Sequence, residues 1–373
     1  DRTAELAEKA GATVLVHNDP DPAHHMAAYP LRYGINYIVN DCGIDYDMLI
    51  RVDADNHLND EFSSLMNDAF QSGVDFARPY EGAINATQNF YTKACALFYT
   101  FDSRYGSRVR ERMNLAAHVN GSGAMMSIRM LKATGGYDCL TISEDAEYFI
   151  NRLNDGYKGH FIEDAVVYED MPSSFTDTLN RNKRIASGSV SLLKPKFAKL
   201  IGRFFKTGDF SCLEICLTYS FVFLTTLLSI WIPLYYIYHF LFLGFAAYGW
   251  LPLTLQPAAY YHASLWNTVI IGGSIVVGLF LFFGYLQALF LVLADYKKLG
   301  AKKRRELLSA VFLFPLFLIL YAVTLCIGTM SKPTWGRAKR NAQTPALEEE
   351  QAPAATAQLE AAATEDETDE QNE

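Results

Sequence analysis

The chain has 373 residues, of which 20% are charged, and carries a formal net charge of −9 at pH 7. Ten of its 41 acidic residues lie in the last 26 positions, and the remaining 31 nearly balance the 32 basic residues. A near-neutral folded part lacks the basic stripe of nucleic-acid-binding proteins, so no nucleic-acid partner is expected.

The N-terminal segment has the pattern of a short helix followed by an apolar run. DRTAELAEKAG starts with a capping Asp or Thr and ends at Gly11, and ATVLV follows. An α/β unit that opens on its helix lacks the strand that normally precedes it. We therefore expect the first strand of the domain to lie upstream of Asp1.

Residues 1–190 alternate between strand-like and helix-like segments. MLIRV, at 48–52, is a nearly continuous apolar run that predicts a strand covered on both faces. The segment 62–73 places its apolar side chains on one helical face and ends at Gly73, and the strand-like VDFARPY follows. This alternation predicts an α/β sheet.

Two aspartates, Asp53 and Asp55, directly follow the first of these strands. Ligands of α/β sheets bind beyond the carboxyl ends of the strands, where both residues are expected. Two carboxylates at this spacing suit a divalent cation that in turn holds a diphosphate. The alternative is a role in a turn or in capping a helix.

A second acidic pair, Glu144 and Asp145, opens the helix predicted within TISEDAEYFINRLNDGYKG. Ser143 is expected to cap this helix and Gly156 to end it. One of the two carboxylates can serve as a general base that takes the proton of an attacking hydroxyl. The alternative is that both only stabilise the helix through its dipole. The predicted inner face consists of Ala146, Phe149, Ile150 and Leu153.

Three basic residues, Arg181, Lys183 and Arg184, stand close together in LNRNKRIASG, just before a predicted amphipathic helix. Basic residues next to a membrane commonly meet anionic lipid. They can also clamp a departing diphosphate, which gains charge as it leaves. The residues alone leave both interpretations open.

The amphipathic helix predicted at 191–208 has an apolar face and a basic face. A basic amphipathic helix directly before long apolar segments is typical of a helix on a membrane surface. The alternative is an ordinary surface helix of the α/β domain. The apolar face consists of Phe197, Leu200, Ile201, Phe204 and Phe205, and the basic face of Lys196, Lys199, Arg203 and Lys206.

Residues 209–330 form a predicted transmembrane region with three apolar stretches, each long enough to cross a hydrocarbon core of about 30 Å. The positive-inside rule places the basic loop 296–306 in the cytoplasm, together with the α/β domain. Three crossings satisfy that loop but leave the basic segment 331–340 outside. A hairpin about Pro233 would give four crossings and reverse both assignments. The stretches lie near 212–245, 264–294 and 307–330.

The remaining features of the sequence carry less information about function. Residues 341–373 are rich in Ala, Glu and Thr and are predicted to be disordered. The six cysteines are scattered and form no CxxC pair, so neither a zinc site nor a redox site is indicated.

The order of these motifs resembles that of the membrane-bound family 2 glycosyltransferases, which include cellulose, hyaluronan and poly-N-acetylglucosamine synthases. The resemblance extends over residues 1–330, and VNGSGAMMSIRML is similar to the family's Gly–Ser segment before the acidic pair. It implies a GT-A-type α/β domain that binds a nucleotide sugar, an interfacial helix and about three transmembrane helices.

The resemblance also implies roles for the acidic residues. Asp53 would contact the nucleotide diphosphate, and Asp55, with Asp53 beside it, would hold a Mn²⁺ or Mg²⁺ ion. Asp145 would be the general base, and Glu144 would stand next to it. The aspartate that binds the nucleobase in the family is expected upstream of the sequence.

The family's Gln-(Gln/Arg)-x-Arg-Trp motif falls on residues 181–185, where only Arg184 is retained. Arg184, with Lys183 and Arg181 close by, would steady the leaving UDP. Arg181 replaces the first Gln, and Ile185 replaces the Trp that binds the acceptor at the entrance to a polymer channel. The loss of this Trp implies non-processive transfer.

We therefore predict an inverting glycosyltransferase at the cytoplasmic membrane. It would move a sugar from a UDP-linked donor to an acceptor hydroxyl of a glycan or of a lipid-linked glycan, in contact with membrane lipid. The alternative is a non-catalytic membrane relative that binds a nucleotide sugar or a partner enzyme. Arg181, Ile185 and the absent first strand favour this alternative.

Overall fold

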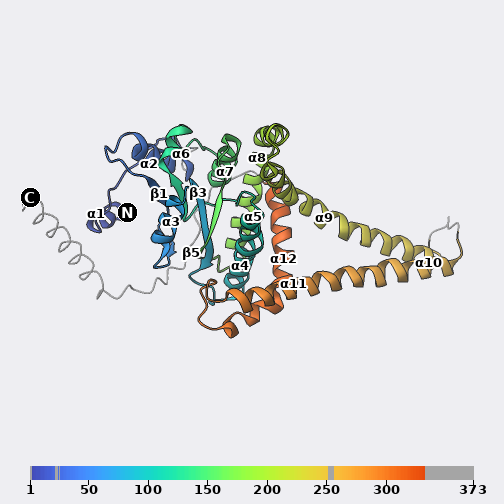
Figure 1. Cartoon of the computed structure of the whole chain (residues 1–373). Helices are drawn as coiled ribbons and strands as arrows, with labels where there is room; N and C mark the ends of the chain where they lie inside the picture. Colours follow the sequence, from blue (N-terminus) through green and yellow to red (C-terminus); the bar gives the residue numbers. More distant parts are fainter. Residues whose placement is uncertain (1, 22–23, 25, 251–255, 332–373) are drawn as a thin grey trace, which may run out of the picture. The chain divides into compact units, whose positions relative to one another are not determined.

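The computed structural model describes residues 2–21, 24, 26–250 and 256–331, and Figure 1 shows the chain coloured along its sequence. An α/β domain precedes a C-terminal set of long apolar helices, as predicted. The tail at 341–373, which is predicted to be disordered, lies outside the described residues.

A mixed sheet forms the centre of the α/β domain. Its order is β1-β4-β3-β5-β2, with β3 and β5 parallel and the other neighbours antiparallel. The strands predicted in MLIRV and VDFARPY are β1 and β3. The described strands are β1 (Met48–Arg51), β2 (His57–Leu58), β3 (Phe76–Ala83), β4 (Ala124–Ser127) and β5 (His160–Glu169).

The surroundings of β1 differ from those predicted. The apolar run predicts a strand covered on both faces, but the residues of β1 are only half-buried. The reason is that β1 lies at an edge of the described sheet and pairs with β4 alone. The run ATVLV forms no strand either, and Val16 is 61% exposed, because no described strand pairs with it.

Helices cover both faces of the sheet. Neighbouring residues of a strand point to opposite faces. Phe76 and Met126 therefore pack with α7 on one face, and Ala77 and Met125 pack with α3 on the other. The helices of the domain are α1 (Thr3–Lys9), α2 (Ala28–Asn40), α3 (Phe62–Gln71), α4 (Phe90–Phe101), the π-helical turn η2 (Asp102–Ser107), α5 (Arg108–Arg112), α6 (Ile128–Ala133) and α7 (Glu144–Asp155).

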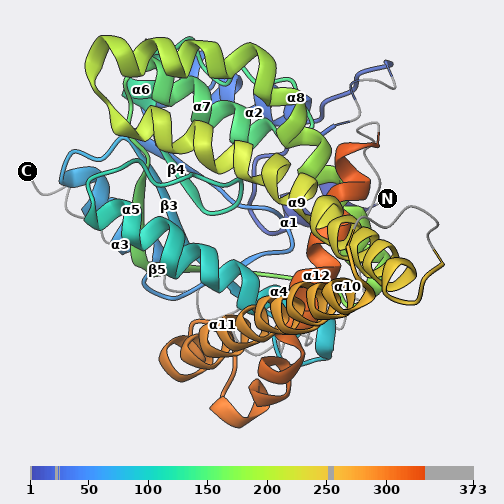
Figure 2. The ribbon, with the colours of Figure 1, turned by 90° about the vertical axis from the view of Figure 1, so that its right-hand side faces the viewer.

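The helix α8 (Phe175–Thr207) is longer than predicted. It contains both the basic segment and the amphipathic segment, so the boundary expected near residue 190 falls inside one continuous helix. Leu200 is fully buried in the core of the domain, whereas Phe205 is 80% exposed. The apolar face is thus divided between the domain and the surface. Figure 2 shows α8 running alongside α7.

Three helical segments of the described chain are long and apolar enough to cross a membrane, which confirms the predicted number. α9 is continuous through Pro233, so the hairpin that would give a fourth crossing does not form. The start of α9 packs into the domain, where Cys212 and Ile215 are buried. The spans are Ile230–Ala247 of α9 (Phe210–Ala247), Ala258–Asp295, which comprises α10 (Ala258–Ser264), the π-helical η3 (Leu265–Gly272) and α11 (Gly273–Asp295), and α12 (Leu308–Thr329).

The chain returns to the α/β domain at the end of α11. Asp295 accepts hydrogen bonds from the Tyr80 hydroxyl at 3.1 Å and from Arg104 Nη1 at 2.6 Å. In the basic loop that follows, Lys298 Nζ donates to the carbonyl of Glu163 at 2.9 Å. The loop, which includes the 3₁₀ turn η4 (Arg304–Glu306), therefore packs against the α/β domain. α12 then packs against α4 and α8.

Candidate active site

The two aspartates after β1 lie in a turn that is held by the Gly–Ser segment before β4. The backbone N–H of Asp53 donates to Ser122 Oγ at 3.1 Å. Asn56 Nδ2 donates to the same hydroxyl at 2.6 Å, and the N–H of Asn56 donates to the carbonyl of Asp53 at 3.0 Å. The Asp53 side chain is 52% exposed, and Asp55 is half-buried. The turn thus presents carboxylates at the strand end, as predicted.

Arg51, the last residue of β1, joins this turn to the second acidic pair. Its Nη2 donates to Glu144 Oε1 at 2.8 Å and lies 3.7 Å from Asp53 Oδ1. The Arg51 side chain is only 9% exposed. A Cβ at Gly121 would lie 3.1 Å from the guanidinium, so this glycine leaves room for it. The two acidic motifs therefore meet around one buried arginine.

The helix that carries the second acidic pair begins as predicted, but its cap differs. Ser143 occupies the N-cap position of α7 without making a capping hydrogen bond through its side chain. Asp145 Oδ1 instead accepts from the N–H of Ala146 at 2.7 Å. Ser143 Oγ lies against Gly188 of α8, so the hydroxyl packs between two helices. The helix ends at Gly156, whose φ is +102°.

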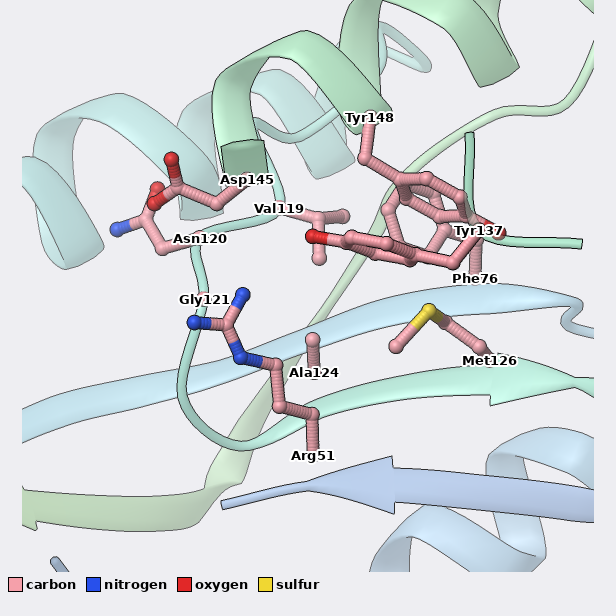
Figure 3. Close-up of a pocket in the computed structure, with 10 residues that line it drawn as sticks. All are labelled: Arg51, Phe76, Val119, Asn120, Gly121, Ala124, Met126, Tyr137, Asp145 and Tyr148. Carbon is pink, nitrogen blue, oxygen red and sulfur yellow. The ribbon is translucent and has the colours of Figure 1, made fainter. Parts of the chain in front are cut away.

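A small cavity of about 10 Å³, which is room for about one water molecule, lies between the sheet and the start of α7. Figure 3 shows the Asp145 carboxylate beside the side chain of Asn120, and the Tyr137 hydroxyl facing the Arg51 guanidinium. Asn120 is itself held by a short hydrogen bond from its Nδ2 to Glu81. The cavity brings together a carboxylate, an amide and aromatic rings. Its lining residues are Arg51, Phe76, Val119, Asn120, Gly121, Ala124, Met126, Tyr137, Asp145 and Tyr148.

The site carries more negative than positive charge. Burial raises the pKa of the Asp53 carboxyl above its usual value, and the Arg51 guanidinium only partly offsets this rise. Burial also raises the pKa of Glu144. The neighbouring Asp145 carboxylate raises this pKa further, and the Arg51 guanidinium lowers it. A diphosphate would meet repulsion here unless a cation came with it. The other carboxylates that raise the pKa of Asp53 are those of Glu169, Asp55 and Asp145.

The turn after β1 fits a hard divalent cation such as Mg²⁺, which needs few protein ligands. In the described part of the chain, no group of three or more His, Cys, Asp or Glu side chains is placed to enclose a metal. Mg²⁺ and similar hard ions are bound through one or two carboxylates, with phosphate oxygens of the substrate completing the shell. Asp53 and Asp55 at an accessible turn supply such a pair of carboxylates.

The three basic residues of the basic segment all lie on α8, but their surroundings differ. Arg181 Nη2 donates to Glu169 Oε2 at 2.9 Å, and its guanidinium lies 4.6 Å from the centre of the Tyr99 ring. Lys183 and Arg184 are half-buried on the same helix. Since Glu169 acts on the pKa of Asp53, the Arg181–Glu169 pair lies within electrostatic reach of the turn. The structure thus joins the two acidic motifs through Arg51, and it places Arg181 of the basic segment beside Glu169.

Several residues of the site were not among the predicted ones. The only local signal for Arg51 is one charge inside the apolar run MLIRV, which demands a buried partner. Ser122 stands in the Gly–Ser segment, but its contact with the Asp53 turn joins residues 69 positions apart. Asn120 stands in the same segment, but its partner Glu81 has no signal in the sequence, because only the fold brings the two side chains together.

Comparison with known proteins decides the family. The model described as "Glycosyl transferase family group 2" matches residues 48–327, which is most of the chain. This chain belongs to glycosyltransferase family group 2. No curated protein matches it. As a family 2 glycosyltransferase it transfers a sugar from a nucleotide-sugar donor to an acceptor, and its apolar helices are those of a membrane protein.

Proposed function

We propose that this family 2 glycosyltransferase is an inverting enzyme that uses a UDP-sugar and glycosylates a hydroxyl of a glycan or lipid-linked glycan at the cytoplasmic face of the membrane. One observation carries the proposal. Arg51 Nη2 lies 2.8 Å from Glu144 Oε1 and 3.7 Å from Asp53 Oδ1. The turn that is expected to hold the donor and the acidic pair that is expected to contain the base therefore lie in one site.

Asp145 is the general base in this proposal. Its carboxylate lies at the cavity, whereas the neighbouring Glu144 is 7% exposed and paired with Arg51. Asp145 takes the proton of the acceptor hydroxyl as the oxygen attacks the anomeric carbon, and UDP leaves from the opposite face of the sugar. A single displacement of this kind inverts the configuration at that carbon.

The donor diphosphate is held by the turn after β1. Asp55, with Asp53 beside it, would hold a Mn²⁺ or Mg²⁺ ion, which neutralises the diphosphate when bound. The excess of carboxylates around Asp53 supports this cofactor, because these residues alone would repel a diphosphate.

The basic segment of α8 has two different tasks. Arg184, with Lys183 near it, steadies the leaving UDP, whose charge grows in the transition state. Arg181 orders Glu169 at the end of β5, as their 2.9 Å hydrogen bond supports. Ile185 has no aromatic face on which an acceptor sugar could stack, so the acceptor leaves after one or a few transfers.

The α/β domain faces the cytoplasm in this proposal. The basic loop 296–306 packs on the domain through Lys298, so both lie on one side of the membrane. The positive-inside rule assigns such a loop to the cytoplasm. The exposed Phe205, Lys199 and Lys206 of α8 meet the membrane surface.

The test is release of UDP by the full-length protein in membranes, with a panel of UDP-sugars, Mn²⁺ or Mg²⁺, and candidate lipid and glycan acceptors. We expect release with one donor and none from the Asp145→Asn variant. Binding of a UDP-sugar without release by the wild-type protein would instead identify the non-catalytic relative.

A further inference from the structure

Arg51 is an unusual residue for its place. It ends a strand of otherwise apolar residues, and its side chain is 9% exposed. Its guanidinium touches three separate segments, namely the turn at Asp53, the Gly–Ser segment at Gly121 and the start of α7 at Glu144. No other described side chain is shown to touch all three segments.

The Arg51–Glu144 pair is costly if its only purpose is stability. Removing both charges from water carries a large desolvation cost, and well-packed apolar residues in place of a buried ion pair often give equal or better stability. The pair has, however, a defined geometry, with Nη2 and Oε1 at 2.8 Å. In some proteins a buried polar or ionic group fixes how two segments lie against each other.

We propose that Arg51 is a positioning residue for sugar transfer, which clamps Glu144 and so fixes the first turn of α7 against the Asp53 turn. The proposal rests on the proposed function, because it concerns how the base and the donor site are held relative to each other. Glu144 is bound by the clamp, and its neighbour Asp145 is thereby directed to the cavity. Arg51 lines the cavity, but in this proposal it acts on the reaction through Glu144 and Asp145.

The clamp predicts a change in kcat more than in KM. A displacement of about 1 Å at the base costs on the order of 10²-fold in rate. Without the clamp the Asp53 turn is loosened but is still held by Ser122, so KM for the donor is expected to change by less than about threefold.

The experiment compares Arg51→Met, Arg51→Lys and the double variant Arg51→Met/Glu144→Gln. Arg51→Met is expected to lower both the unfolding temperature and kcat, because it leaves Glu144 buried and unpaired. Arg51→Lys, which keeps the charge but not the planar fork, is expected to lose about tenfold in kcat. Arg129→Met is the control, since Arg129 is an exposed arginine of the same domain.

The double variant separates positioning from charge compensation. It contains no unpaired buried charge, so its unfolding temperature is expected to return to near that of the wild type. Its kcat is expected to stay at least about 30-fold low, because the clamp is absent. Recovery of both stability and kcat would show that Arg51 only compensates the charge of Glu144, and would overturn the proposal.

A second measurement needs no activity and therefore separates this inference from the proposed function. Hydrogen–deuterium exchange is followed over residues 52–56 and 143–147 in the wild type and the double variant. We expect both segments to exchange at least about fivefold faster in the variant, with the rest of the domain unchanged. Unchanged exchange in both segments would refute the clamp, even for a protein that turns over no donor.

Discussion

Gly188 of α8 lies directly against the side chain of Ser143, the residue before the first turn of α7. A Cβ on Gly188 would overlap the Ser143 hydroxyl oxygen, so the contact leaves no room for a side chain at position 188. This contact places the helix of the basic segment next to the helix of Glu144 and Asp145. It is the direct link between those two motifs.

The Gly188→Ala variant tests this link. The added methyl group would overlap Ser143 Oγ and lie 2.9 Å from Ser143 Cβ, so turning the hydroxyl is not enough and α8 and the start of α7 must move apart. We expect kcat to fall about tenfold and stability to fall by about 1–3 kcal/mol. Gly202→Ala on the same helix is the control, because nothing lies within 4 Å of a Cβ there. Equal effects of the two substitutions would count against the link.

Metal dependence is tested at Asp55. Asp55→Ala removes one of the two carboxylates of the turn, so we expect transfer to be abolished while the protein still folds, since the turn lies at the surface. Chelation with EDTA is expected to have the same effect on the wild type. Asp60→Ala, at an exposed aspartate of the following segment, serves as the control. Normal turnover in EDTA would remove the metal from the reaction.

The choice of base within the acidic pair is tested by two amide substitutions. Asp145→Asn removes the proton acceptor at the cavity, and turnover is expected to fall by ~10²-fold or more with donor binding kept. Glu144→Gln keeps an amide oxygen that can accept from Arg51, so its effect on turnover is expected to be smaller. The opposite order of the two effects would move the role of base to Glu144.

Product length is tested at Ile185. Because isoleucine offers a growing chain no flat aromatic face, we expect products of one or a few added sugars when they are sized by mass spectrometry. Ile185→Trp is expected to lengthen the products, whereas Ile185→Leu, the matched control, should leave them unchanged. Wild-type polymers of many tens of units would place the protein with the processive synthases.

The attachment of α9 to the domain is expected to depend on pH through Glu214. This carboxylate accepts from Arg110 Nη2 at 2.7 Å and lies 3.5 Å from His118 Nε2. Burial would raise its pKa, but the interactions with His118 and Arg110 hold it well below the usual value. A lowered pKa in the folded state adds stability above about pH 4.5, and this contribution is lost as the pH falls further.

The Glu214→Gln variant measures that contribution. We expect a loss of about 2 kcal/mol in the free energy of unfolding at pH 7, seen as a lower unfolding temperature. The difference from the wild type should shrink towards pH 3, because the unfolded wild-type chain then takes up a proton at Glu214. Glu61→Gln, at an exposed glutamate, is expected to show no difference at either pH. A difference independent of pH would exclude the ionic contribution.

Features with a local cause could be predicted from the sequence. The helices α3 and α7 follow from apolar side chains at helical spacing and from the glycines Gly73 and Gly156, which both adopt a positive φ. The three apolar spans follow from their length and composition alone. The turn at Asp53 and Asp55 follows from an apolar strand that ends in charge. Each of these patterns depends only on residues that are close together in the sequence.

Only the tertiary structure decided how these parts meet. The partner of Arg51 is 93 positions away, and that of Tyr80 is 215 positions away. The edge position of β1, the length of α8 and the burial of the first turns of α9 also depend on which surfaces pack together. The physical reason is that a buried charge or apolar face needs a partner. Which residue becomes that partner depends on how the whole chain folds, and a local sequence pattern does not determine it.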